Sequence, residues 1–296
     1  WGQGEHTLKQ QQELLQEAEE QGFILAGQGP SVLHIGQEEE VSPRLQVFLE
    51  ATVHSLEWVA EGLVLARGGK STRLLGVQGG RLEVRGPEVR HRDWLLASLP
   101  GPEGLHLLTA HNSLLLLEEG GRESREVGRP CSGPCILYSG MLLPLPSSSP
   151  LVVAGTVQGA VLLWHSYSGQ QLHSLQGHDG VILGLAHCAL THALASCSDD
   201  RSVCVWGVAG RDLPSLQGWR GAEVSLQHRL YGHLARVHRA LFLPSLLYTA
   251  GEDGRLAVWN LDTGQLVDSG EPCGGAALWS LCGEGGGVVV GGGDGS

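Results

Sequence analysis

Three polar residues in the middle of the chain are of the types that perform nucleophilic catalysis. His178, Ser196 and Asp200 supply an imidazole, a hydroxyl and a carboxylate. In a hydrolytic triad the carboxylate orients the histidine, and the histidine accepts the proton of the serine hydroxyl. A catalytic triad is therefore one interpretation, and a purely structural hydrogen-bond network is the other.

The same residue types occur twice at one spacing, which decides between the two interpretations. One set is His178, Ser196, Asp200 and Trp206, and the other is His233, Thr249, Asp253 and Trp259. In each set the Asp lies six residues before the Trp, and the Ser or Thr lies four residues before the Asp. A buried indole N–H needs an acceptor, which the hydroxyl provides, and His and Asp complete the network. A nucleophile needs no second copy, so we expect two structural tetrads and no catalytic residue.

Metal and cofactor sites have little support in the sequence. Cys131 and Cys135 could form half of a zinc site, but no second Cys or His pair lies at a suitable spacing. The residues between them favour a simple turn. The chain has no Gly-x-Ser-x-Gly elbow and no Walker motif, and its glycine-rich tail has no Gly-x-Gly-x-x-Gly loop. We therefore expect no metal, no cofactor and no enzymatic activity.

The elements that hold the tetrads are strand pairs. Each tetrad spans an apolar strand, an acidic turn and a second strand that ends at the Trp. Weaker copies repeat along the chain at separations of 40 to 53 residues, and the earliest copies lack the Trp and Asp, so we expect apolar packing to hold them. The pairs lie near residues 22–36, 62–77, 105–118, 150–165, 192–206, 245–259 and 287–296. Residues 1–21 are acidic and rich in Gln, and we expect a separate segment there, either helical or disordered.

The composition is that of a folded chain with many turns. Of 296 residues, 42% are hydrophobic, 17% are charged and 45 are Gly, a pattern typical of short strands joined by tight turns. The net charge of −12 excludes a general basic surface of the kind that binds nucleic acid without specificity. Seven scattered cysteines favour reduced thiols. With no signal peptide and no apolar stretch of membrane-spanning length, we expect a cytoplasmic protein.

The two tetrads, each preceded by a Gly-His pair, closely resemble the WD-repeat β-propeller family. The resemblance implies an all-β, seven-bladed WD-repeat propeller over residues 22–296, with its last blade truncated at the C-terminus. Further stretches are similar to one group of these propellers, in order along the chain: 92–94, 110–113, 200–203, 232–237, 250–253 and 291–294.

The closer resemblance also implies a function. That group consists of non-catalytic scaffolds that partner an FtsJ-type tRNA ribose methyltransferase and help to position tRNA. The methyltransferase, by this resemblance, transfers a methyl group to the 2′-hydroxyl of the wobble nucleotide. The alternative is a generic protein-interaction propeller in a signalling or trafficking complex.

A set of basic residues could contact RNA or a partner protein. Its members are Arg201, Arg236, His238, Arg239 and Arg255 in the fifth and sixth blades, with His111 in an earlier turn. The turns that carry them gather on one face of a propeller, where arginine is suited to bidentate contact with phosphate. The alternative is a solvated surface with local ion pairs, each of which stabilises little.

Overall fold

The computed structural model describes residues 23–28, 31–36, 46–48, 53–78, 81–118, 120–129, 135–146, 149–213, 215–284 and 287–293. The expected segment 1–21, Cys131 and the turn residue Asp294 lie outside these residues. The chain divides into two compact units. The first contains Trp1–Thr109 and Leu114–Val127, and the second contains Ala110–Ser113 and Gly128–Ser296.

The first unit consists of antiparallel sheets in which each strand pairs with the next along the chain. β1 (Phe23–Gln28), β2 (Ser31–Gly36) and β3 (Gln46–Phe48) form a three-stranded sheet. The second sheet contains β4 (Ser55–Ala60), β5 (Leu63–Gly68), β6 (Ser71–Gln78) and β7 (Arg81–Val84), and β8 (Val89–Arg90) also pairs with β6. The third contains β9 (Leu95–Gly101), β10 (Gly104–Thr109), β11 (Leu114–Leu117) and β12 (Arg125–Gly128).

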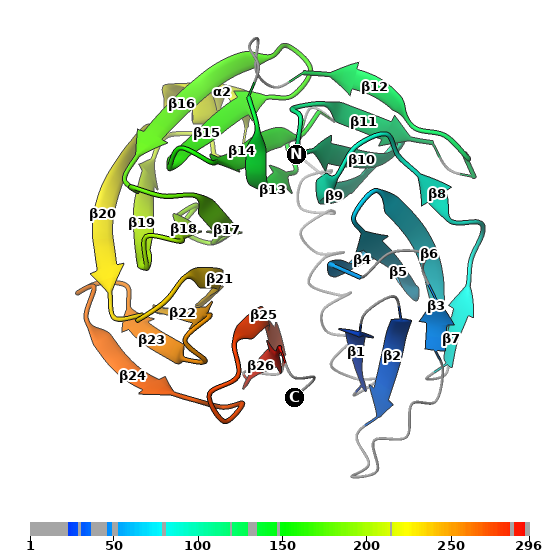
Figure 1. The fold of residues 1–296 in the computed structure, drawn as a ribbon. Coiled ribbons are helices and arrows are strands. Elements are labelled where there is room, and N and C mark those ends of the chain that lie inside the picture. The colour runs from blue at the N-terminus through cyan, green and yellow to red at the C-terminus, as the bar shows by residue number, and fades with distance from the viewer. Residues whose placement is uncertain are drawn as a thin grey trace. The chain divides into compact units, whose positions relative to one another are not determined.

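The second unit repeats the four-stranded pattern. Its sheets are β13 (Leu137–Leu143), β14 (Leu151–Thr156), β15 (Ala160–His165) and β16 (Gln170–Gln176); β17 (Ile182–His187), β18 (Leu194–Ser198), β19 (Ser202–Ala209) and β20 (Glu223–Tyr231); and β21 (Val237–Leu243), β22 (Leu246–Gly251), β23 (Leu256–Asn260) and β24 (Leu266–Gly270). A two-stranded sheet, β25 (Leu278–Glu284) with β26 (Gly287–Gly292), follows. Within this unit the first strands β13, β17, β21 and β25 are neighbours (Figure 1).

The central strands of the second unit are buried because sheets pack against both of their faces. Every residue of β14 and of β18 is buried, and both strands consist mainly of apolar residues, as expected for strands without a solvent face. The core between the sheets includes Leu163, Leu194 and Trp206. Consecutive sheets are therefore held together chiefly by apolar burial.

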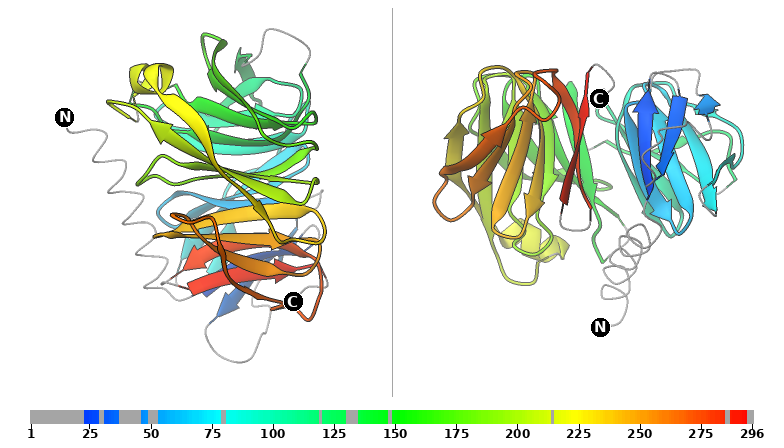
Figure 2. Two further views of the ribbon diagram at one scale, coloured as in Figure 1. Left: turned by 90° about the vertical axis from the view of Figure 1, so that its left-hand side faces the viewer. Right: turned by 90° about the horizontal axis from the view of Figure 1, so that it is seen from below.

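The short helix α2 (Leu216–Gly221) belongs to the connection from β19 to β20. The Ser215 hydroxyl caps it by accepting a hydrogen bond from the backbone N–H of Gly218 at 2.9 Å. Figure 2 shows α2 beyond the ends of the strands, at one end of the second unit. The turns that carry the predicted tetrads lie at the opposite strand ends, because the β18–β19 turn and the β19–β20 connection join opposite ends of β19.

The expectation of an all-β propeller fold is confirmed. In the described part of the chain, five sheets have four or more strands and form complete blades, and the sheets β1–β3 and β25–β26 have three and two strands.

Candidate functional site

The first predicted tetrad comes together at one end of the sheet β17–β20. The indole N–H of Trp206 on β19 donates to Ser196 Oγ on β18 at 3.0 Å. Ser196 Oγ lies 2.8 Å from His178 Nε2, and His178 Nδ1 lies 3.0 Å from Asp200 Oδ2. A carboxylate only accepts, so His178 Nδ1 carries the proton and the Ser196 hydroxyl donates to Nε2. Each of the four polar groups thus has a partner.

The second predicted tetrad has the same arrangement in the sheet β21–β24. The indole N–H of Trp259 donates to Thr249 Oγ1 at 2.9 Å, and that oxygen lies 2.8 Å from His233 Nε2. His233 Nδ1 lies 3.1 Å from each carboxylate oxygen of Asp253. Asp253 also accepts the backbone N–H of Leu234 at 2.7 Å, which ties the loop before β21 to the turn after β22.

The electrostatics of the tetrads favour the charged form of both aspartates and, in the first tetrad, the neutral form of His178. Burial opposes the charged form of Asp200, but hydrogen bonds from the Ser202 hydroxyl and from the backbone N–H groups of Asp179 and Ser202 outweigh it and hold the pKa of Asp200 well below its usual range. Burial also opposes the charged form of Asp253, but hydrogen bonds from the backbone N–H of Leu234 and from the side chain of His233 outweigh it and lower the pKa of Asp253. The pKa of His178 is lowered by burial, although Asp200 pulls the other way.

The catalytic interpretation of the first tetrad is excluded by access. Ser196 is completely buried, at 0% exposure. Its hydroxyl already donates to His178 and accepts from Trp206, so no substrate carbonyl can reach it. The same holds for Thr249, which is also completely buried.

Known proteins share this repeat and this fold. Residues 169–207, which span the whole first tetrad, match the family model described as WD domain, G-beta repeat. The chain carries a WD repeat in a β-propeller fold. The β-propeller domain of Cps50 (Swd1) from Myceliophteria thermophila has a TM-score of 0.71 to it, at 15% identity, over 94% of this chain and 91% of that one.

Several curated relatives carry a functional name. The protein named tRNA (34-2′-O)-methyltransferase regulator WDR6 is 28% identical over 264 residues in Bos taurus and 27% identical over 262 residues in Homo sapiens. Each alignment covers 80% of this chain. The chain spans 23% of the length of these curated relatives. The resemblance of the ordered motifs to one group of WD-repeat propellers is confirmed.

The glycine before the histidine of each tetrad has a steric reason that the sequence alone did not reveal. A Cβ at Gly177 would lie 2.6 Å from Cη2 of Trp206. A Cβ at Gly232 would lie 2.8 Å from Cη2 of Trp259. Each glycine therefore lets the loop backbone approach the indole ring. In the sequence, the repeated Gly-His pair before both tetrads is the pattern that marks these glycines.

Arg229 on β20 extends the first tetrad and was not predicted. Its guanidinium donates to Asp179 Oδ2 at 2.9 Å and to Asp200 Oδ2 at 3.2 Å, and it lies over the ring of Tyr231 at 5.5 Å from the centroid. The register pairs Arg229 with Cys204 on β19, which brings it to the turn. No local spacing marks this residue, because the contact depends on the pairing of β19 with β20.

Polar networks also stabilise the first unit, where apolar packing alone was expected. His91 is buried, with Nε2 at 2.9 Å from Thr72 Oγ1 and Nδ1 at 2.8 Å from Ser124 Oγ. Arg67 is buried too and donates to Glu57 Oε1 at 2.7 Å. An apolar core is also present, so the expectation was incomplete.

The predicted contact residues lie in several different turns and strands. Arg236 and Arg239 lie beside His238, and Arg236 is 3.8 Å from Glu252. His238 itself is buried. The other three predicted residues are Arg201, which is exposed with φ 70°, Arg255, 3.9 Å from Glu271, and His111, exposed in the β10–β11 turn.

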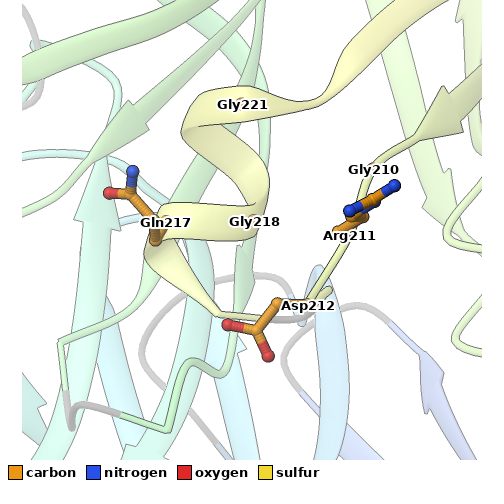
Figure 3. A pocket seen from close by; sticks show the side chains of 6 residues that line it. All are labelled: Gly210, Arg211, Asp212, Gln217, Gly218 and Gly221. Carbon is orange, nitrogen blue, oxygen red and sulfur yellow. The ribbon is translucent and has the colours of Figure 1, made fainter.

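A shallow depression of about 680 Å³ lies beside α2, at the strand ends opposite the tetrads. Gly210, Arg211, Asp212, Gln217, Gly218 and Gly221 line it. The side chains of Arg211, Asp212 and Gln217 point in different directions and do not converge (Figure 3). In the described ranges, no three or more His, Cys, Asp or Glu residues are grouped to hold a metal ion. No helix among the described residues has the length and apolar character needed to cross a membrane.

Proposed function

We propose that this chain is part of a non-catalytic WD-repeat regulator of tRNA methylation at the 2′-hydroxyl of nucleotide 34, the wobble position. The observation that carries the proposal is the similarity, over 80% of the chain, to proteins named as regulators of the tRNA (34-2′-O)-methyltransferase. The buried tetrads agree with it, since their hydroxyl groups hold the fold together and have no access to a substrate.

In this proposal an FtsJ-type methyltransferase performs the chemistry in the cytoplasm, and the propeller positions the tRNA. The tetrads stabilise the turns on the face that meets these partners. Arg201, Arg236, Arg239, Arg255, His238 and His111 are the proposed contact residues. Residues 22–296 then form seven blades, and the first and last, β1–β3 and β25–β26, have three and two strands among the described residues.

Depletion of the full-length protein tests the proposal. Mapping of 2′-O-methylation in cellular tRNA should show loss at nucleotide 34 and no loss at other ribose-methylated positions, which serve as the internal control. A tagged copy should recover an FtsJ-type methyltransferase. Unchanged methylation at nucleotide 34, with recovery of signalling or trafficking proteins instead, would establish the generic interaction propeller.

A further inference from the structure

The first strand of each sheet in the second unit has a bulge at its second residue. The pairing register shifts between Leu137 and Ser139, between Ile182 and Gly184, between Val237 and Arg239, and between Leu278 and Ser280. The residues at the bulges are Tyr138, Leu183, His238 and Trp279. Because β13, β17, β21 and β25 are neighbours, these four residues occupy corresponding places at one end of the unit.

Two of these bulge residues stack on each other. The imidazole of His238 and the indole of Trp279 have ring centroids 4.1 Å apart and planes inclined by only 20°. His238 is buried, and its Nε2 has no hydrogen-bond partner. The stack on Trp279 therefore covers one face of the His238 ring.

Trp279 differs from the structural tryptophans in its exposure. It is 52% exposed, whereas Trp206 and Trp259 are 3% and 2% exposed. A large aromatic ring gains free energy from burial, so a ring that is fixed in place and half exposed is suited to a ligand that can cover it. The bulge on β25 presents this ring and the bulge on β21 supports it.

Two arginines flank the stacked His238 along the chain, and both act on its imidazole electrostatically. Arg239 follows His238 directly and donates to its backbone oxygen at 3.0 Å. Arg236 precedes it by two residues and is exposed, with Glu252 at 3.8 Å. An exposed ion pair at that distance contributes little, so a phosphate can replace the carboxylate. An aromatic face next to arginines is the combination that binds unpaired bases and their backbone.

We propose that Trp279, supported by His238, is a stacking platform for an unpaired RNA base, with Arg236 and Arg239 contacting the adjacent phosphates. The inference rests on the proposed function, because that function supplies RNA as the ligand class. The arginines favour RNA over an apolar peptide as the occupant.

The experiment measures binding of a fluorescent anticodon stem-loop RNA to the full-length protein. Trp279→Ala should weaken binding by about tenfold, the size expected for loss of one base–aromatic stack, and Trp279→Phe should retain most of it. A duplex RNA without a loop should bind wild type and Trp279→Ala equally. Trp94→Ala is the matched control, because Trp94 is 51% exposed beside His54 but inclined to it by 52°; it should bind as wild type does.

Each of the following outcomes would overturn the inference. Equal affinity of wild type and Trp279→Ala would do so, as would an equal loss in Trp94→Ala. Loss of the methyltransferase from Trp279→Ala with RNA affinity retained would make the surface a protein contact. If Trp279→Ala fails to fold, a 4-thiouridine crosslink from the loop of the RNA to residue 279 in the wild type decides, and its absence counts against the platform. Methylation of nucleotide 34 in depleted cells tests the proposed function separately.

Discussion

The Cα of Gly177 lies against the six-membered ring of Trp206, and a methyl group at residue 177 would stand 2.6 Å from Cη2 of the indole. The indole N–H of the same ring donates to Ser196 at 3.0 Å. The ring is therefore fixed from two sides, by a backbone with no side chain and by a hydrogen bond. Gly-His and Trp in this WD repeat form one packing unit.

Gly177→Ala should destabilise the protein by about 1–3 kcal/mol, because the added methyl group overpacks the site. Trp206→Phe should relieve the clash, since phenylalanine has no atom in the place of Cη2. A double-mutant cycle by chemical denaturation measures the coupling. If Gly177→Ala costs the same in both backgrounds, the packing unit does not exist.

Trp206→Ala should lower the free energy of unfolding by about 3–5 kcal/mol through loss of a buried ring. Trp206→Phe should cost less, because it removes the hydrogen bond to Ser196 but keeps most of the ring. His178→Leu should destabilise by a few kcal/mol, because it breaks a satisfied buried network. Thermal and chemical unfolding give these values. Trp94→Ala, at a residue 51% exposed, is the control and should lie near wild type; an equally small effect of Trp206→Ala would contradict the tetrad.

Stability should fall as the pH drops from about 6.5 toward 4. Burial lowers the pKa of His91 to about 4, whereas an unfolded histidine titrates near 6.5. Between these values the unfolded state binds a proton that the folded state does not, so acidification favours unfolding. In His91→Gln the free energy of unfolding should fall less between pH 7 and 4.5 than it does in the wild type, by on the order of 1–2 kcal/mol. Chemical denaturation at a series of pH values measures this. The same dependence of unfolding free energy on pH in both proteins would show that His91 does not titrate in this way.

Two buried thiols should resist alkylation in the folded protein. Burial raises the pKa of Cys197 and of Cys204 to about 12, which suppresses the reactive thiolate. Exposed Cys282 should be labelled by iodoacetamide first. Peptide mass spectrometry at intervals measures the three rates, and labelling of all three in denaturant is the control. Native labelling of Cys197 as fast as that of Cys282 would argue against the packed core.

The tetrads could be predicted because their residues follow a local rule. The hydroxyl, the turn aspartate and the tryptophan lie on two strands joined by one turn, so their spacing is constant in both repeats. The contact of Arg229 with Asp179 could not be predicted in this way. It depends on the register of β19 with β20 and joins residues 50 positions apart.

The contact residues were the least predictable part of the site. Charge suggested that His238 is a polar surface residue, but the structure shows it buried and stacked on Trp279. That position depends on bulges in two different strands, which carry no residue signal in the sequence. The His91 network with Thr72 and Ser124 was missed for a similar reason, since it joins residues from separate strands and turns.

The most direct test is the rate of 2′-O-methylation at nucleotide 34 in a purified system. The reaction contains an FtsJ-type methyltransferase, tRNA and S-adenosylmethionine, with and without the full-length protein. Methylation should be faster when the protein is present, and the rate should level off once the protein reaches the concentration of the methyltransferase. The protein alone should give no methylation. An equal rate with and without the protein, under conditions where the methyltransferase is active, would contradict a regulatory role.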